Sequence, residues 1–155
     1  MYDRIVVAVD GSEASTRALN EAVRLAGNQH SRLRLVHVVD TFCLYRGGEG
    51  ERAPEVEEAW REAGRKVLAQ ARVLASQSAI EVETALHCTN GTRVSEEIVE
   101  DARRWGADLI VMGTHGRRGL NRLLLGSVAE GVARISPISV LLVLGQRDQG
   151  QPARP

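Results

Sequence analysis

Apolar positions follow two different periods along this chain. Continuous or alternating apolar runs predict five strands, namely Ile5–Val9, Leu33–Val39, Ile80–Leu86, Leu109–Met112 and Ile138–Leu144. Apolar residues spaced by three or four predict four helices between them, namely Ser12 to Gly27-Asn28, Pro54–Ser76, Val94–Trp105 and Ser127–Ile135. Strands that alternate with helices specify an α/β fold with a parallel sheet and right-handed crossovers.

The second predicted helix has a long apolar stripe. Trp60 is expected to lie in the core or in an interface, and the stripe consists of Val56, Ala59, Trp60, Ala63, Val67, Ala71 and Leu74. The segment before it, from Thr41 to Ala53, has no apolar period and is expected to be a flexible connection.

The connection after the fourth predicted strand is rich in glycine. Gly113, Gly116 and Gly119 fall at every third position, and Gly126-Ser127 then leads into a helical pattern. A helix start presents free amides and a positive dipole end, which suit a phosphate. Positive charge is added by Arg117, Arg118 and Arg122. A mobile surface loop is the alternative, although connections much longer than about 2 to 6 residues are usually functional.

A second candidate lies at the end of the first predicted strand. Asp10 follows the run Ile5–Val9 directly and precedes Gly11 and Ser12. Aspartate is favoured in turns because its carboxylate accepts hydrogen bonds from nearby amides. Asp10 is therefore either a turn acceptor or part of a ligand pocket.

Composition limits the function classes. The 155 residues suit one domain, and 20 basic residues balance 20 acidic ones, which gives no general attraction to nucleic acid or to an anionic membrane. No apolar run approaches the length of about 18 residues needed to span a membrane, and no signal pattern is present, so we expect a soluble, cytoplasmic protein. The polar tail, residues 146–155, is expected to be disordered.

The remaining histidines and cysteines give weaker signals. His37 is expected to be a packed or hydrogen-bonded strand residue. His115 lies in the glycine-rich connection and is expected either to contact a ligand or to be a solvated loop imidazole. His87 and Cys88 are adjacent, but no further ligand stands at a usable spacing, which disfavours a metal site. Cys43 and Cys88 are expected to be reduced thiols.

The glycine pattern resembles that of a known family. Gly113, two residues, Gly116, nine residues and Gly126-Ser127 match the signature of the nucleotide-binding (ATP-binding) branch of the universal stress protein family. The resemblance also covers Tyr2–Ser15, Leu33–Asp40, Ala107–Gly119 and Ser136–Val143. It implies one universal stress protein domain over residues 1–145, with an open five-stranded parallel sheet, strand order 3-2-1-4-5 and helices on both faces (adenine nucleotide alpha hydrolase-like).

That strand order would bring the two candidates together. It reverses between the first and fourth strands, and ligands bind beyond the carboxyl ends of strands at such a point. The implied cofactor is ATP, or AMP or ADP, and Asp10 is the expected ligand of an accompanying Mg²⁺ ion. The implied binding residues are Ala8, Asp10, Val38, Met112, Gly113, Thr114, His115, Gly116, Arg117, Arg118, Gly119, Gly126, Ser127, Val128 and Ala129.

Three functional hypotheses follow. The first is a dimeric stress-response module that binds an adenine nucleotide and alters its contacts with an unknown protein partner. The second is a slow Mg-dependent ATPase or phosphotransferase, although no dedicated catalytic base is evident. The third is a scaffold whose loop binds nothing. The dimer is expected through Ile138–Leu144, because this uncharged strand lies at a sheet edge in the implied order.

Overall fold

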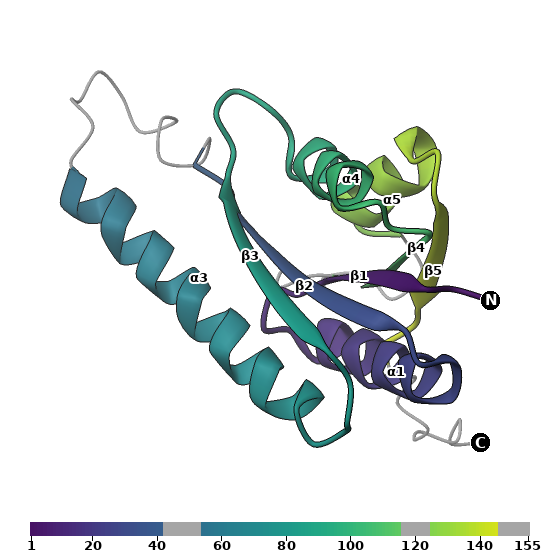
Figure 1. The fold of residues 1–155 in the computed structure, drawn as a ribbon. Coiled ribbons are helices and arrows are strands. Elements are labelled where there is room, and N and C mark those ends of the chain that lie inside the picture. The colour runs from purple at the N-terminus through teal and green to yellow at the C-terminus, as the bar shows by residue number, and fades with distance from the viewer. Residues whose placement is uncertain (42–53, 116–124, 146–155) are drawn as a thin grey trace, which may run out of the picture.

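The computed structural model describes residues 1–41, 54–115 and 125–145. Strands and helices alternate along these residues (Figure 1). The elements are β1 (Arg4–Ala8), α1 (Glu13–Gln29), β2 (Arg32–Val39), α3 (Pro54–Ala75), β3 (Val82–Cys88), α4 (Val94–Trp105), β4 (Leu109–Gly113), α5 (Ser127–Ile135) and β5 (Ser139–Val143). The sequence prediction of an α/β fold is confirmed.

The strands form one parallel sheet in the order β3-β2-β1-β4-β5. Ile5 of β1 pairs with Leu33 of β2 on one side and with Leu109 of β4 on the other. The order therefore reverses between β1 and β4, as the family resemblance implied. A crevice beyond the carboxyl ends of these two strands is the expected ligand position in such a sheet.

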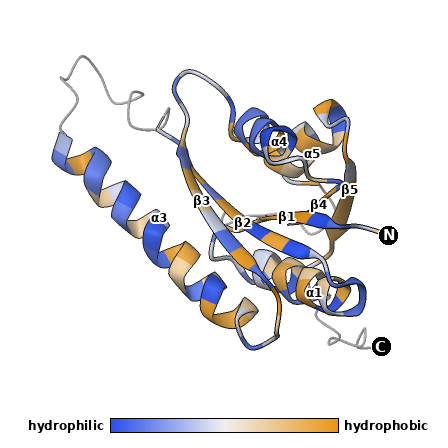
Figure 2. Ribbon diagram, in the orientation of Figure 1, coloured by the Kyte–Doolittle hydropathy of each residue, from blue (hydrophilic) through white to orange (hydrophobic). Residues whose placement is uncertain are grey.

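Helices cover both faces of the sheet. Helices α1 and α3 lie on one face, and α4 and α5 lie on the other (Figure 1). Figure 2 shows hydrophobic and hydrophilic residues alternating along β2, whereas the helices combine apolar and polar stripes. The strands β1 and β4 are buried on both sides, which explains their unbroken apolar sequences.

The predicted apolar stripe of α3 is only partly buried, at Val67 and Ala71. The buried residues of the helix are Gly64, Leu68, Ala71 and Ala75, whereas Trp60 is 42% exposed and Val56 is 45% exposed. A Cβ atom on Gly64 would lie 2.7 Å from Leu86 Cδ1 and 2.8 Å from His37 Cδ2. The helix thus approaches the sheet most closely at Gly64, where it has no side chain. A hydropathy pattern does not identify such a position, because it counts apolar side chains.

Two element boundaries also differ from the prediction. Helix α1 continues past Gly27 to Gln29, and His30 ends it in the left-handed conformation with φ 58°. Strand β3 begins at Val82 and continues to Cys88, because its ladder with β2 pairs Val39 with Cys88. No helix among the described residues combines the length and the hydropathy required to cross a membrane.

An ion-pair network connects the sheet to α4. Asp101, whose side chain is 4% exposed, accepts hydrogen bonds of 2.9 Å from Nε and Nη2 of Arg34. It also lies 2.7 Å from His87 Nε2. Burial tends to raise the pKa of the Asp101 carboxyl, but the hydrogen bonds from Arg34 and His87 outweigh it, so that this pKa lies below its ordinary value.

We expect Asp101→Asn to lower the free energy of unfolding at pH 7 by about 1 to 3 kcal/mol, because Arg34 loses its buried counter-charge and keeps the more exposed Glu83, 3.1 Å from its Nη1 atom. The pKa of Asp101 is lower in the folded than in the unfolded protein. Its contribution is therefore complete above the unfolded-state value of about 4 and disappears as the pH falls through the folded-state value. Urea unfolding at pH 7 and at about pH 3 measures both effects.

The neighbouring Glu100→Gln is the matched control. The Glu100 carboxylate pairs with Arg103 and Arg104 at 3.9 and 3.5 Å on the exposed side of α4. Such surface pairs contribute little. Equal losses of stability in the two variants would contradict the role assigned to Asp101.

Candidate functional site

Asp10 closes a tight turn between β1 and α1. Its Oδ1 atom accepts a hydrogen bond of 2.8 Å from Ser12 N, and Gly11 has φ 79°. Ser12 caps α1 by accepting from Ser15 N at 3.1 Å. The predicted order of strand, turn and helix cap is confirmed, and Asp10 acts as a turn acceptor. Its role toward a nucleotide stays a prediction.

The end of β4 lies in contact with this turn region. A Cβ atom on Gly113 would lie 2.8 Å from the backbone carbon and from Cβ of Ala14, and 2.9 Å from its carbonyl oxygen. Only glycine allows α1 to start this close to β4 without displacement. The contact between Gly113 and Ala14 therefore brings the end of β4 close to the Asp10 turn. Ala14 was not among the residues predicted from the sequence.

The start of α5 is also fixed to the end of β4. Gly126 N donates a hydrogen bond of 2.8 Å to Thr114 O, and Thr114 N donates one of 3.0 Å to Val143 O. A Cβ atom on Gly126 would lie 3.0 Å from Thr114 O. The prediction that Ser127 stands at a helix start is confirmed, since α5 runs from Ser127 with Gly126 as its N-cap.

The amino terminus of α5 has no side-chain cap among the residues that the structure describes. Gly126 caps the helix without a side-chain hydrogen bond, whereas Ser12 caps α1 through its hydroxyl. The amides of the first helical turn have no acceptors within the helix. Ser127 is exposed, and its hydroxyl lies beside these amides in sequence. These groups suit an anion, because amides and the positive dipole end both attract negative charge.

The other described candidates border the same end of the sheet. Ala8 pairs with Val36, and Val38 follows two residues later on β2, beyond the end of the β1 ladder. Met112 is 5% exposed at the end of β4, and Ala129 is 2% exposed in the first turns of α5. Val128 is half-buried in the same helix. The candidates that lie outside the described residues are Gly116, Arg117, Arg118 and Gly119.

His115 follows Thr114 at the exit of β4. Its Nδ1 atom lies 2.9 Å from Thr114 Oγ1. Its Nε2 atom is buried and has no hydrogen-bond partner among the residues that the structure describes. A buried polar atom without a partner is uncommon in folded proteins and calls for an explanation.

The other predicted histidine and cysteine positions belong to the scaffold. His37 is buried, and its Nδ1 atom lies 2.7 Å from Val9 O, which confirms the prediction of a hydrogen-bonded strand residue. His87 pairs with Asp101 as described above. Cys88 is a free thiol whose pKa is raised by burial, and Cys43 lies outside the described residues. Within residues 1–41, 54–115 and 125–145, no group of three or more potential ligands could hold a metal ion.

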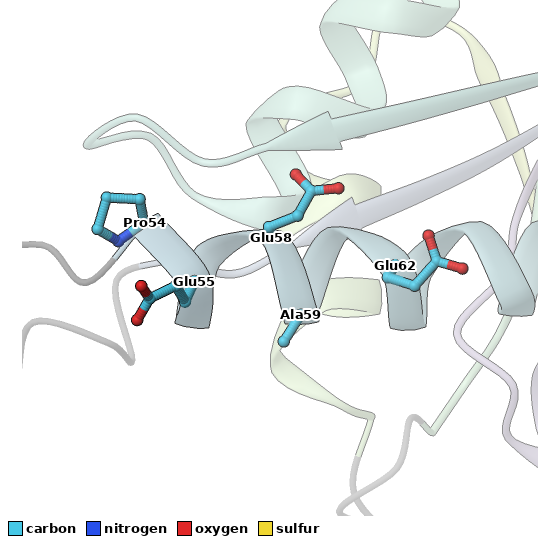
Figure 3. Close-up of a pocket in the computed structure, with 5 residues that line it drawn as sticks. All are labelled: Pro54, Glu55, Glu58, Ala59 and Glu62. Carbon is cyan, nitrogen blue, oxygen red and sulfur yellow. The ribbon is translucent and has the colours of Figure 1, made fainter.

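One open hollow lies on the first turns of α3 (Figure 3). Its lining consists of Pro54, Glu55, Glu58, Ala59 and Glu62. Two of its three carboxylates are paired with Arg65, at 2.7 and 3.0 Å. The hollow was not predicted from the sequence, and its carboxylates make it unsuitable for phosphate.

Comparison with known proteins places this geometry in a family. The model of the universal stress protein family matches residues 1–143. The chain belongs to the universal stress protein family. Universal stress protein MJ0531 of Methanocaldococcus jannaschii is 35% identical over 144 residues, which cover 92% of this chain and 82% of the relative.

Two solved structures of similar fold contain nucleotides. A universal stress protein in complex with cAMP has a TM-score of 0.68 and 27% identity, and the match covers 92% of this chain and 97% of that one. The universal stress protein of Archaeoglobus fulgidus in complex with dAMP has a TM-score of 0.65 and 26% identity, with 92% and 98% covered. The predicted fold and family are therefore confirmed.

We expect Gly113→Ala to destabilise the protein by about 1 to 3 kcal/mol, because the added methyl group overlaps the backbone of Ala14. Gly145→Ala is the matched control at the same end of the sheet, since nothing lies within 4 Å of its added Cβ atom. Denaturant midpoints of the two variants measure the difference. A Gly113 variant as stable as the Gly145 variant would show that the close contact does not hold the two turns together.

Proposed function

We propose that this protein binds ATP or a related adenine nucleotide between the Asp10 turn and the start of α5. One observation supports this most directly. The uncapped amino terminus of α5 is held to the end of β4 by the hydrogen bond from Gly126 to Thr114. The same strand end touches α1 at Ala14, so that a ligand at this point meets both turns.

The phosphates are assigned to the α5 side of the site. The first amides of α5 and the hydroxyl of Ser127 donate hydrogen bonds, residues 125–129 carry no acidic side chain, and Glu130 in the first turn is exposed. Charge-assisted bonds of this kind are among the strong ones in proteins. The arginines Arg117 and Arg118 stay predicted contributors of positive charge.

The ribose and adenine are assigned to the β1 and β2 side. The carboxylate of Asp10 repels phosphate but accepts hydrogen bonds from ribose hydroxyls. Val38 lies at the end of β2, where its backbone groups suit the edge of the adenine, and Ala8 suits a wall of the adenine pocket. A Mg²⁺ ion would use Asp10 to offset the charge of the phosphates.

The family comparison supports an adenine nucleotide rather than phosphate alone. The two solved relatives hold cAMP and dAMP, which share an adenine, a sugar and a phosphate. This protein has the same fold over the matched region, with the glycine pattern at Gly113, Gly126 and Ser127. We further propose that it acts in the cytoplasm as a dimeric regulatory module of a stress response, whose contacts change with nucleotide occupancy.

We expect Gly126→Asp to abolish ATP binding and Gly126→Ala to retain most of it. Both variants add the same Cβ atom near Thr114 O, but only aspartate places a negative charge at the proposed phosphate position. Equilibrium binding of labelled ATP measures the difference. Unaltered affinity in the aspartate variant would exclude the phosphate site.

Ser127→Ala should weaken ATP binding by about 1.5 to 3 kcal/mol, the cost of one hydrogen bond to a charged acceptor.

Release of inorganic phosphate over many turnovers, measured on the same samples, tests the alternative of a slow ATPase or phosphotransferase. A turnover that depends on Mg²⁺ and on Asp10 would favour that alternative over a binding module.

The proposed dimer uses the strand β5 and its flanks, Ile138–Leu144. Strand β5 lies at one edge of the sheet and carries no charged residue. Its backbone groups on the outer side have no strand partner in the described sheet, which favours pairing with a second copy. Leu144 at its end is 66% exposed.

We expect light scattering at micromolar concentration to give twice the chain mass of 16.9 kDa. Leu144→Lys should weaken the dimer at least about tenfold, because burial of one leucine contributes about 1.5 to 3 kcal/mol. Val73→Lys is the matched control, since Val73 is 65% exposed on α3, away from β5. A monomeric wild-type protein would exclude the proposed interface.

A further inference from the structure

The side chain of His115 is held at one end and unsatisfied at the other. Nδ1 lies 2.9 Å from Thr114 Oγ1, and the Thr114 side chain is buried, with the residue 4% exposed. Nε2 is buried without a partner among the described residues. Burying a polar atom without a hydrogen bond costs stability, so a ligand that supplies the missing bond would be favoured.

The position of His115 connects this atom to the proposed phosphate site. A Cβ atom on Gly126 would lie 3.7 Å from His115 Cα and 3.0 Å from Thr114 O. The backbone of His115 therefore lies beside the N-cap of α5. The His115 side chain is therefore attached close to the first amides of α5, which have no acceptor within the helix.

A second buried atom without a partner differs in this respect. Arg32 Nε is also unpartnered in the described residues, but the Arg32 guanidinium already bonds Glu81 and Glu83 through Nη2, at 2.7 and 2.8 Å. No carboxylate in the described part of the chain bonds the His115 ring in this way. The buried Nε2 atom therefore lacks an acceptor in the described part of the chain, and a phosphate oxygen would supply one.

We propose that His115 Nε2 donates a hydrogen bond to a phosphate oxygen of the bound nucleotide, and that Thr114 is the positioning residue. When the Thr114 hydroxyl donates to Nδ1, the ring hydrogen is on Nε2, which makes that atom a donor. In this arrangement His115 contacts the phosphate of the nucleotide and does not contact the adenosine. This inference rests on the proposed nucleotide function and specifies which group recognises the phosphate.

Two substitutions at His115 separate the ring nitrogens. Asparagine places its amide near the position of Nδ1, whereas glutamine reaches the position of Nε2. We expect His115→Asn to weaken ATP binding about tenfold or more, and His115→Gln to retain affinity within a few-fold. Adenosine should bind the wild-type protein and both variants equally, because it has no phosphate. His30→Asn, at the exposed end of α1, is the matched control.

Two substitutions at Thr114 test its positioning role. Thr114→Val removes the hydroxyl and keeps the shape, whereas Thr114→Ser keeps the hydroxyl. The valine variant should weaken ATP binding and change the ¹⁵N shifts of the His115 ring, and the serine variant should restore both. A structural role alone would change thermal stability without changing the ratio of ATP to adenosine affinity.

The outcomes distinguish this inference from the proposed function. If the wild-type protein binds ATP and His115→Asn binds it equally well, the role of His115 is overturned and the nucleotide site stands. Equal weakening of ATP and adenosine would overturn it too, because phosphate recognition predicts a selective loss. If the wild-type protein binds no adenine nucleotide, the proposed function fails together with this inference.

Discussion

The close contact between the end of β4 and the start of α1 is the constraint on which the site depends. It leaves no room for a side chain at Gly113, whose Cβ atom would lie 2.8 Å from the backbone of Ala14. Packed interiors yield little to such overlap. The contact therefore fixes the Asp10 turn relative to β4, and the hydrogen bond from Gly126 to Thr114 fixes the start of α5 relative to the same strand.

Close approach at glycine recurs in the layers around the sheet. Gly64 brings α3 against β2 and β3, and a Cβ atom on Gly131 would lie 2.6 Å from Ser95 Oγ, so that α5 meets α4 there. These contacts make a rigid frame, which allows donors at its edge to stay in place without a ligand. Preorganised donors lower the cost of binding because little ordering is left to occur.

The sequence predicted the order of elements well, because the apolar patterns of the strands and of the helices are regular over most of the chain. The apolar runs of β1 and β4 and the step from Gly126 to Ser127 were located correctly, and the family resemblance supplied the strand order. The apolar stripe of α3 identified only part of its buried face, because hydropathy gives weight to Trp60 whereas the closest packing is at Gly64. The burial of His115 Nε2 without a partner in the described part of the chain could not be predicted, because the burial of one atom depends on the packing around it in the folded protein.

The two helices that border the site, α1 and α5, are capped differently at their amino termini. Ser12 satisfies an amide of α1 through its own side chain, whereas Gly126 offers α5 no such bond. Missing caps and unpaired buried atoms reduce stability unless a ligand supplies the bonds. Thr114 links this incomplete end to the edge strand, because its amide donates to Val143 O while its carbonyl accepts from Gly126 N. A bound phosphate and a dimer at β5 would therefore act on opposite sides of one residue, which gives nucleotide occupancy a short physical route to the proposed interface.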